Sequence, residues 1–448
     1  MKKLPKEIIE FSKVFSEAGY QLYLVGGAVR NMAAGLLPRD YDFTTDAEPE
    51  NVVKLFKRVI PTGIKHGTVT VLFKKNSFEV TTFRVDGKYS DARRPDSIEY
   101  TKDLNEDLKR RDFTINAMAY DIADKKLMDP QNGQEDLKNG IIRAIGNPVE
   151  RFNEDGLRLL RACRFAAQLN YKIDPETLEG MKKTSSNIKK VSAERIMEEI
   201  VKIMGTVMPS ISFEIMRETG ILEIILPELS LCIGVEQKGF HEFDVYRHSI
   251  YACDAAPADN LNVRLAALFH DIGKPVTAAV NDDNFPTFHK HEHVSADMTG
   301  EILKRLKFSR KTEEDVCHLI RKHMFNYSQS WTDSAVRRFI SKTGVEYIRD
   351  LFFLRQADQY GFSKKVYLYD SLDELKKRID KVLEEDSALS VKDLAVDGKE
   401  LMKRLNIGPG PVIGTILEHL LETVLDDPSQ NDKDKLLEIA EKFYKTIK

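Results

Sequence analysis

The stretch Leu22–Thr45, LYLVGGAVRNMAAGLLPRDYDFTT, decides the predicted fold of this chain. The short apolar run Leu22–Val25 predicts a β-strand, which ends at Gly26 and Gly27. A helical run, Ala28–Gly35, follows the two glycines. Free backbone N–H groups and the helix dipole favour a bound phosphate at such a position. The stretch therefore predicts a strand, a phosphate-binding turn and a helix, in that order.

Two aspartates, Asp40 and Asp42, follow in a second segment that resembles a strand. Residues i and i+2 of a strand point to the same face, so we expect the two carboxylates to project together. Such acids repel each other unless they share a divalent cation, and Mg²⁺ suits the pair because it accepts carboxylates, phosphates and waters. A third candidate acid, Glu79, lies in the last of three predicted strands. These strands are Val59–Ile64, Thr68–Phe73 and Phe78–Phe83.

This ordered combination resembles the DNA polymerase β nucleotidyltransferase superfamily, in which a glycine turn precedes a paired-acid strand and a third acid. The strings GGAVRN and RDYDFTT look more closely like the signature of tRNA nucleotidyltransferases and bacterial poly(A) polymerases. One departure is Asn31, which follows Arg30 where the family usually has an acid, and which is not one of the metal acids. The resemblance implies catalytic roles for Asp40, Asp42 and Glu79, with Mg²⁺ bound by the two aspartates.

A second family motif is RRDFTINAMAYD, residues Arg110–Asp121. A planar guanidinium group can donate two parallel hydrogen bonds to triphosphate oxygens, and a carboxylate can accept hydrogen bonds from the hydroxyl groups of ribose. By resemblance, Arg111 and Asp112 hold the incoming nucleotide, with Asp112 on the sugar. The polar, turn-rich segment Arg84–Lys109 precedes this motif and is expected to be a mobile flap carrying Arg93, Arg94 and Pro95. In the family the matching loop is needed to add the final A, so its full length here counts against an enzyme that adds only CC.

The string EDGLRLLRACRFA lies in a predicted amphipathic helix, Glu154–Leu169, with Leu157, Leu160 and Phe165 on the buried side. Side chains three or four residues apart share a helical face, so Asp155 and Arg158 are expected to lie together, with Arg161 one turn further on. The family places its amino-acid template here, where this pair would meet the Watson–Crick edges of C and A but not of G or U. The nucleotide-binding residues implied in total are Gly26, Gly27, Arg30, Arg111, Asp112, Asn116, Asp155, Arg158, Arg161 and Arg164. Two supporting motifs are the turn Asp129–Asp136 and the helix start Ser192–Arg195, which braces the template helix in the family.

A set of histidines and aspartates follows in the C-terminal half, around the string HDIGKP. Imidazole and carboxylate groups bind first-row divalent metals, and five or six of them can support a two-metal hydrolytic centre. The set resembles the HD phosphohydrolase superfamily, which implies either a transition metal or Mg²⁺. His289 and His293 compete with His291 for one of the positions. The implied ligands are His248, His270, Asp271, His291, His323 and Asp358.

Composition limits the class of protein. The 448 residues are enough for about two to four domains, and a formal net charge of −3 means that contact with RNA requires local basic patches. The cysteines are widely spaced without a CxxC motif, so neither a zinc knuckle nor a disulfide framework is predicted. There is no signal peptide and no apolar run of about 18 residues, so we expect a cytoplasmic protein with no membrane span.

We therefore predict an α+β fold: an N-terminal polymerase-β-type nucleotidyltransferase head with a mixed sheet and helices, followed by all-helical neck, body, HD and tail regions. The predicted boundaries are 1–140 for the head, 141–205 for the neck with the template helix, 206–240 for an RNA-binding body, 241–385 for the HD domain and 386–448 for the tail.

The implied activity is template-independent addition of C, C and A, from CTP and ATP, to the 3′ end of tRNA. A metal-dependent phosphohydrolase in the HD domain would act on 2′,3′-cyclic phosphates or phosphate esters, as in RNA repair. Three alternatives remain open: an enzyme that adds only A, a poly(A) polymerase, and an HD phosphohydrolase whose head merely binds RNA.

Overall fold

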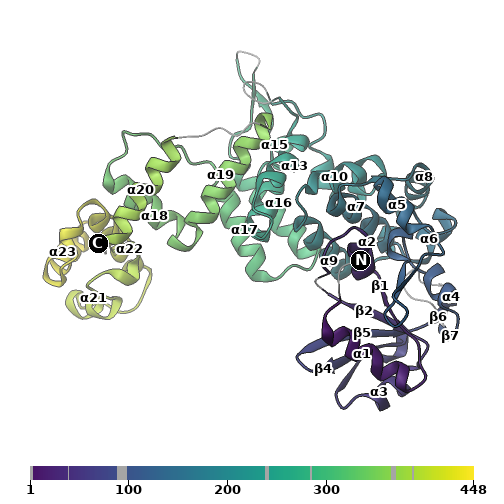
Figure 1. Cartoon of the computed structure of the whole chain (residues 1–448). Helices are drawn as coiled ribbons and strands as arrows, with labels where there is room; N and C mark the ends of the chain where they lie inside the picture. Colours follow the sequence, from purple (N-terminus) through teal and green to yellow (C-terminus); the bar gives the residue numbers. More distant parts are fainter. Residues whose placement is uncertain are drawn as a thin grey trace. The chain divides into compact units, whose positions relative to one another are not determined.

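The computed structural model describes residues 4–38, 40–87, 98–237, 242–282, 285–364, 370–385 and 388–447. The chain forms two compact units, the first comprising Met1–Val235 with Glu301–Glu313 and the second Glu236–Gly300 with Glu314–Lys448 (Figure 1). Throughout these described ranges, every helix is too short or too polar to cross a membrane. The predicted flap residues Arg93, Arg94 and Pro95 lie outside the described residues.

The first unit is built on a mixed sheet with the strand order β3-β4-β5-β2-β1-β8-β9. Strands β2 and β5 run parallel, and the other neighbouring pairs are antiparallel. The predicted strands are confirmed to within two residues at each end, and Thr68–Phe73 has the predicted bounds. The bounds are β1 Leu22–Val25, β2 Asp42–Thr45, β3 Val59–Gly63, β4 Thr68–Phe73, β5 Asn76–Thr82, β8 Ala119–Asp121 and β9 Lys126–Met128.

The expectation that Asp40 and Asp42 share a strand was wrong for Asp40. Strand β2 begins at Asp42, which pairs with Val25, the last residue of β1. The chain turns away at Gly26, whose φ of +64° is in the left-handed region that favours glycine, so β1 offers no partner for residue 40. Asp40 therefore lies in a bend just before the strand.

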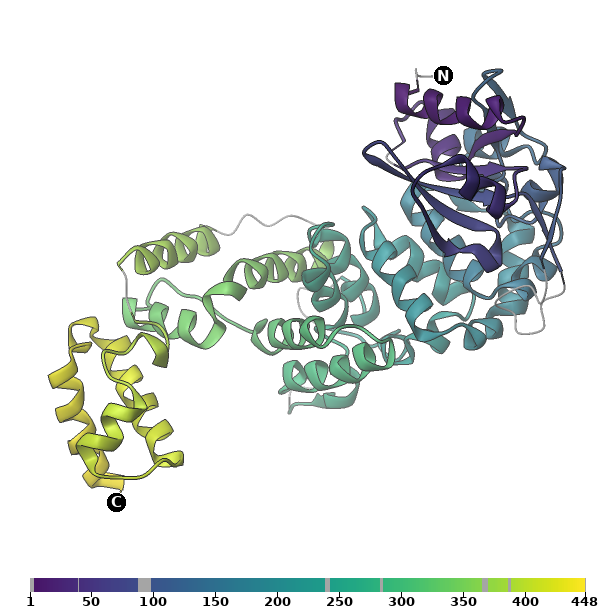
Figure 2. The same cartoon turned by 90° about the horizontal axis from the view of Figure 1, so that it is seen from below.

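Helix α1 packs an aromatic core onto the sheet and lies across it in both views (Figures 1 and 2). The ring of Phe11 lies 5.0 Å from that of Phe43 in β2 and 4.7 Å from that of Phe78 in β5, measured between centroids. Offset and tilted aromatic pairs at this spacing add to the burial of apolar area. This core fixes β2 and β5 side by side beneath the helix. The helices beside the sheet are α1 Lys6–Glu17, α2 Gly27–Ala33 and α3 Pro49–Leu55.

The predicted loop 84–109 has more regular structure than expected. Strand β6 (Arg84–Asp86) pairs antiparallel with β7 (Ile98–Tyr100) to form a two-stranded ribbon. Helix α4 (Leu104–Lys109) follows, and the carboxylate of Asp103 caps it by accepting a 2.8 Å hydrogen bond from the backbone N–H of Asn105. The polar composition concealed both elements, because they are short and carry few apolar residues.

Apart from the short parallel pair β10–β11, the rest of the first unit is helical. Asn147 and Asp174 cap α6 and α8, each just before a proline in the first turn, which is a favourable helix start. The predicted helix Glu154–Leu169 is divided, because α6 ends at Glu154 and α7 begins only at Leu157. The elements after the ribbon are α5 Gly133–Asn139, β10 Ile141–Ile142, α6 Pro148–Glu154, α7 Leu157–Leu169, β11 Lys172–Ile173, α8 Pro175–Thr184, α9 Ala193–Met204, α10 Pro209–Glu218, α11 Leu222–Ile225 and α12 Pro227–Ser230.

The second unit is helical apart from the short hairpin β12–β13 in its described part. Helix α13 packs closely along α19, and Gly361 makes this possible, since a Cβ there would lie 2.8 Å from Nδ1 of His248. Residues 301–313 of α16 and α17 belong to the first unit. The bounds of the elements from residue 245 to residue 384 are α13 Val245–Ala255, α14 Leu261–Phe269, α15 Lys274–Thr277, β12 Ala279–Val280, β13 Pro286–Thr287, α16 His291–Arg305, α17 Arg310–Lys322, α18 Asp333–Thr343, α19 Ile348–Ser363 and α20 Asp370–Glu384.

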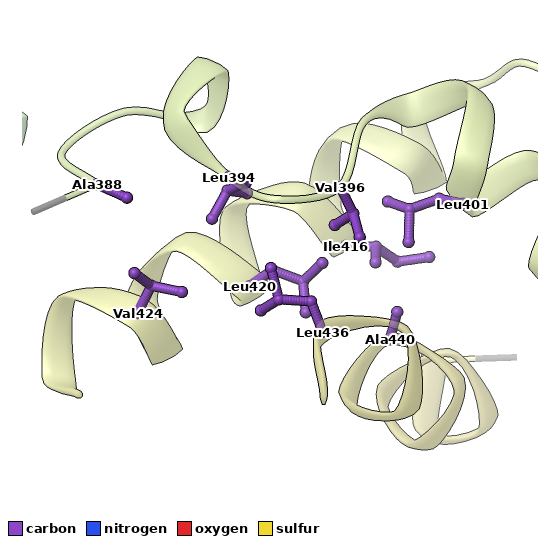
Figure 3. Close-up of a cluster of buried hydrophobic side chains, with 9 residues drawn as sticks. All are labelled: Ala388, Leu394, Val396, Leu401, Ile416, Leu420, Val424, Leu436 and Ala440. Carbon is purple, nitrogen blue, oxygen red and sulfur yellow. The ribbon is translucent and has the colours of Figure 1, made fainter. Parts of the chain in front are cut away.

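The C-terminal segment has a hydrophobic core of its own (Figure 3). Leu401 of α21, Ile416 and Leu420 of α22 and Leu436 of α23 are fully buried in it. Helix α21 begins at Gly398, because Asp397 caps it by accepting hydrogen bonds from the backbone N–H groups of the first turn. The bounds are α21 Gly398–Leu405, α22 Pro411–Asp426 and α23 Lys433–Ile447.

Candidate active site

A polar cavity of about 440 Å³ is lined by helix α2, by the segment that follows α4 and by helix α7. All of the predicted nucleotide-binding residues line it, although they come from segments more than a hundred residues apart. Asp42, Arg110 and Phe165 complete the lining. The predicted residues in the lining are Gly26, Gly27, Arg30, Arg111, Asp112, Asn116, Asp155, Arg158, Arg161 and Arg164.

The cavity has a strongly cationic wall. The guanidinium carbons of Arg30, Arg161 and Arg164 lie 5.2, 5.2 and 4.1 Å from the ring centre of Phe165. Burial and the neighbouring Arg164 lower the pKa of Arg30 to about 10. Among the described residues, Nε of Arg30 and Nε of Arg111 are buried without a hydrogen-bond partner. Clustered guanidinium groups of this kind suit an anionic ligand such as a triphosphate.

Asp112 is the buried acid of this cavity. Its carboxylate accepts hydrogen bonds from Nδ2 of Asn116 at 3.1 Å and Nε of Arg161 at 2.7 Å. Burial alone would raise the pKa of Asp112, but Arg161 and Asn116 outweigh it and lower the pKa to about 2. Arg30 donates to the other end of the same Asn116 side chain at 2.7 Å. The acid is therefore ionised and held in one orientation at neutral pH.

The side chains of the predicted template pair have different partners. Asp155 precedes α7 and accepts hydrogen bonds from the backbone N–H of Leu157 at 3.0 Å and from Arg195 at 2.7 Å. Arg158 instead pairs with Glu154 and donates to the backbone oxygen of Arg110 at 3.1 Å. The expectation that Asp155 and Arg158 share a helical face was wrong, because Asp155 lies before the first residue of α7. Both side chains nevertheless line the same cavity, and the predicted brace from Ser192–Arg195 is the Arg195–Asp155 ion pair.

Three acids line a second cavity next to this one. Asp42 of β2 lies directly opposite Glu79 of the parallel strand β5, and both line this second cavity of about 570 Å³ together with Asp40. Burial raises the pKa of Asp42 and of Glu79, and in Glu79 the neighbouring Asp42 adds to the effect. Asp42 lines both cavities, so the carboxylates adjoin the cationic wall.

The second unit contains a separate cluster formed by the predicted histidines and aspartates. Nε2 of His248 lies 3.0 Å from Nε2 of His270, and Oδ1 of Asp358 lies 3.2 Å from the first and 3.4 Å from the second. Asp271 joins this group to a further one, because its Oδ2 lies 3.3 Å from Nε2 of His270 and its Oδ1 lies 3.2 Å from Nε2 of His291. All six predicted residues are buried, whereas His289 and His293 are exposed. Two groups have metal-ligand spacing, namely His248, His270 and Asp271, and Asp271, His291 and His323.

Backbone oxygens orient three of the imidazoles. Nδ1 of His270, His291 and His323 lies 2.8, 2.8 and 2.7 Å from the backbone oxygen three residues earlier. Such a bond places the proton on Nδ1 and turns Nε2 towards the cluster, as in many metal sites. Burial alone would lower the pKa of His270, but Asp271 and Asp358 raise it to about 10, whereas burial and His270 lower the pKa of His323 to about 3.

Several residues of these sites were missed by sequence reasoning. Phe165 was predicted only as a buried residue, yet it also lines the first cavity. Glu199 was overlooked although it accepts a 2.6 Å hydrogen bond from Nε of Arg164. Lys274 of the HDIGKP string donates to Oδ2 of Asp271 at 2.7 Å. Only Lys274 had a signal in the sequence, its place in the motif, while Glu199 lies in an unremarkable helix.

The fold and both cavities define a class of protein with a nucleotidyl-transfer head. Models of three protein families match the chain: "Poly A polymerase head domain" over residues 22–143, "Probable RNA and SrmB- binding site of polymerase A" over 170–232, and "tRNA nucleotidyltransferase domain 2 putative" over 291–440.

Full-length relatives make the family more specific. The CCA-adding enzyme of Enterococcus faecalis is 31% identical over 98% of this chain and 97% of its own length. That of Ligilactobacillus salivarius is 32% identical over 98% and 96%. The chain belongs to the family of CCA-adding enzymes. The crystal structure of the Bacillus stearothermophilus CCA-adding enzyme in complex with CTP has the same fold, with a TM-score of 0.76 at 24% identity over 100% of this chain and 99% of that one.

Proposed function

We propose that this protein adds C, C and A, from CTP and ATP, to the 3′ end of tRNA. The observation that carries the proposal is the cationic cavity, where all the predicted nucleotide-binding residues adjoin three carboxylates. Membership of the CCA-adding family supports the same conclusion. The 3′-hydroxyl oxygen of the tRNA would form a bond to the α-phosphorus, and the bond from that phosphorus to the bridging oxygen would break, releasing pyrophosphate.

The cavity residues have distinct proposed roles. Asp112 is ionised and is oriented by Arg161 and Asn116, and it would accept hydrogen bonds from the hydroxyl groups of the ribose. The guanidinium groups on the cavity wall would bind the triphosphate. Asp155 and Arg158 would contact the edge of the base after exchanging their present partners, Arg195 and Glu154. Discrimination would arise because a wrong base leaves a buried polar group unsatisfied, at about 1–3 kcal/mol per group.

We propose that Asp40 and Asp42 hold Mg²⁺, with Glu79 beside them. The donor set fits a hard cation, since all three groups are carboxylates that line one cavity, and Mg²⁺ prefers oxygen ligands. All three side chains are exposed to solvent, so a hydrated cation could reach them. When bound, the ion would supply charge stabilisation to the attacking and leaving oxygens.

The test uses three tRNA transcripts that end at the discriminator base, at C and at CC, with CTP and ATP given separately and together. Extension of all three to CCA supports the proposal. Extension of the CC-ended transcript alone, with ATP, would identify an enzyme that adds only A, and long A tails on any RNA would identify a poly(A) polymerase. Failure to transfer label from nucleotides labelled at the α-phosphate would overturn a transferase function and leave a head that only binds RNA.

We further propose that the His/Asp cluster is the metal centre of an HD phosphohydrolase within residues 241–385, as in the class II architecture with head 1–140, neck 141–205, body 206–240 and tail 386–448. The specific observation is that Asp271 faces two groups of ligands with its two oxygens, as a residue bridging two metal ions would. A divalent transition metal or Mg²⁺ bound there would activate a water for attack on phosphate esters or 2′,3′-cyclic phosphates.

This second activity has its own test. Purified protein should retain divalent metal, measured by elemental mass spectrometry, and hydrolyse at least one of the two substrate types. His270→Ala and Asp271→Ala variants should lose both the metal and the hydrolysis, while an exposed neighbour, His293→Ala, should keep both. Absence of hydrolysis above these two alanine variants with every metal supplied would refute the activity.

A further inference from the structure

The side chain of Asp107 joins three parts of the nucleotidyl-transfer head. It is fully buried in helix α4, although aspartate is rarely buried unless it is paired. Oδ1 accepts from Nε of Arg110 at 2.9 Å, and Oδ2 accepts from a terminal guanidinium nitrogen of Arg111 at 3.1 Å. The same carboxylate also receives weaker hydrogen bonds from Oγ1 of Thr44 at 3.3 Å and the backbone N–H of Arg84 at 3.4 Å.

These partners connect the carboxylate to the candidate active site. Arg110 and Arg111 line the cationic cavity, while Thr44 lies two residues after Asp42 in β2 and so shares its strand face. A Cβ built on Gly26 would lie 3.9 Å from both Arg111 and Asp42, which locates the guanidinium group at the phosphate-binding turn. Asp107 itself does not line the cavity.

We infer that Asp107 is a positioning residue that holds Arg110 and Arg111 at the triphosphate-binding side of the cavity, in register with the paired-acid strand. The inference rests on the proposed nucleotidyl transfer and adds a residue to it. Arginine has many rotamers, so an unpaired guanidinium group at the cavity edge would sample several of them, and binding would have to order it again. The buried carboxylate removes that cost before the nucleotide arrives.

Charge is the property that the carboxylate supplies. Burial alone would raise the pKa of Asp107, but Arg111 and Arg110 outweigh it and lower the pKa, so the group is ionised at neutral pH. The Asp107→Asn substitution keeps the shape and one acceptor oxygen but removes the charge. Asp103→Asn is the matched control, because Asp103 lies four residues earlier, is exposed, and caps α4 as well when it is asparagine.

The experiment measures CTP and ATP binding by calorimetry, and the KM for nucleotide and for tRNA in the extension assay. Asp107→Asn should weaken nucleotide binding and raise the KM for both nucleotides by on the order of 10-fold, while the KM for tRNA changes less than about 2-fold. Asp103→Asn should behave as the unsubstituted protein. In an Arg111→Ala background, the effect of Asp107→Asn should fall to about 3-fold or less, because only its action through Arg110 remains.

Equal losses for nucleotide and tRNA, or a full 10-fold effect in the Arg111→Ala background, would overturn the positioning role. Circular dichroism shows whether Asp107→Asn still folds. If it does not, Asp107→Glu replaces it as the test variant, because it keeps the charge, and it should bind nucleotide more tightly than Asp107→Asn. If the unsubstituted protein binds CTP but adds no nucleotide to tRNA, the proposed function is wrong. The nucleotide affinities of the variants then still test the positioning role of Asp107.

Discussion

The buried ion pair between Glu199 and Arg164 gives a quantitative prediction for the cavity wall. Glu199 is only 1% exposed, and it accepts hydrogen bonds from Arg164 at 2.6 Å and from Lys202 at 3.0 Å. Removing the carboxylate leaves the guanidinium group of Arg164 buried beside Arg161, a like charge. Glu199→Ala should therefore destabilise the first unit strongly.

The magnitude follows from the environment of the pair. Breaking a buried ion pair by removing one partner costs about 3–5 kcal/mol. Arg164 keeps a 2.9 Å hydrogen bond to Gln168 and faces a polar cavity, which favours the lower end, about 3 kcal/mol. Glu199→Gln keeps a hydrogen-bond acceptor and should cost about half as much, roughly 1.5 kcal/mol.

Urea denaturation followed by circular dichroism measures the loss, analysed for more than one transition because the chain forms two compact units. Glu198→Gln, an exposed neighbour on the same helix, is the control and should change the unfolding free energy by less than about 0.5 kcal/mol.

The stability that the Glu199 carboxylate contributes should depend on pH. Burial alone would raise the pKa of Glu199, but Arg164 and Arg161 outweigh it and lower the pKa. A lowered carboxyl pKa contributes stability above the unfolded value of about 4.3, and the contribution is lost as the pH falls through the folded pKa. The difference between the unsubstituted protein and Glu199→Gln should therefore shrink below about pH 4.3. Equal stabilities of Glu199→Gln and Glu198→Gln at pH 7, or a difference that persists at low pH, would refute the reasoning.

Three further predictions concern other parts of the chain. Asp42→Asn should abolish nucleotide transfer without lowering the unfolding midpoint, because burial raises the pKa of this carboxyl and its ionised form is disfavoured in the fold; residual transfer would contradict the catalytic assignment. Asp155→Ala should admit UTP or GTP in the extension assay, and unchanged base selectivity would disprove the template role. All four cysteines are buried and none forms a disulfide, so native protein should resist iodoacetamide at pH 8, while protein in urea should take up four labels by mass spectrometry; rapid labelling of the native protein would contradict the burial.

The sequence predicted strands β1 to β5 of the head sheet but not β8 and β9, and it predicted residues that line the first cavity and form the His/Asp cluster, because these predictions depend on local patterns and on motif order. Asp42 and Glu79 were assigned from separate strands, and the parallel register places them opposite each other. His291 could not be separated from its neighbours on sequence alone, since only the start of α16 determines which of the three histidines turns inward.

The rest depends on long-range contacts that no local pattern encodes. Asp155 was predicted to share a helical face with Arg158, but its carboxylate pairs with Arg195, forty residues away in α9. The ribbon β6–β7 was read as a loop because its strands are three residues each, and only their mutual pairing makes them strands.

Hydrogen bonds to backbone oxygens hold the imidazoles of His270, His291 and His323, so the polypeptide backbone determines the geometry of the cluster. In a zinc finger the ion creates the fold, and removing it unfolds the domain. Here hydrogen bonds to backbone oxygens orient the three imidazoles, so their arrangement would not depend on a bound ion. Removal of a bound metal by a chelator should therefore leave the cluster folded and able to bind a different metal afterwards.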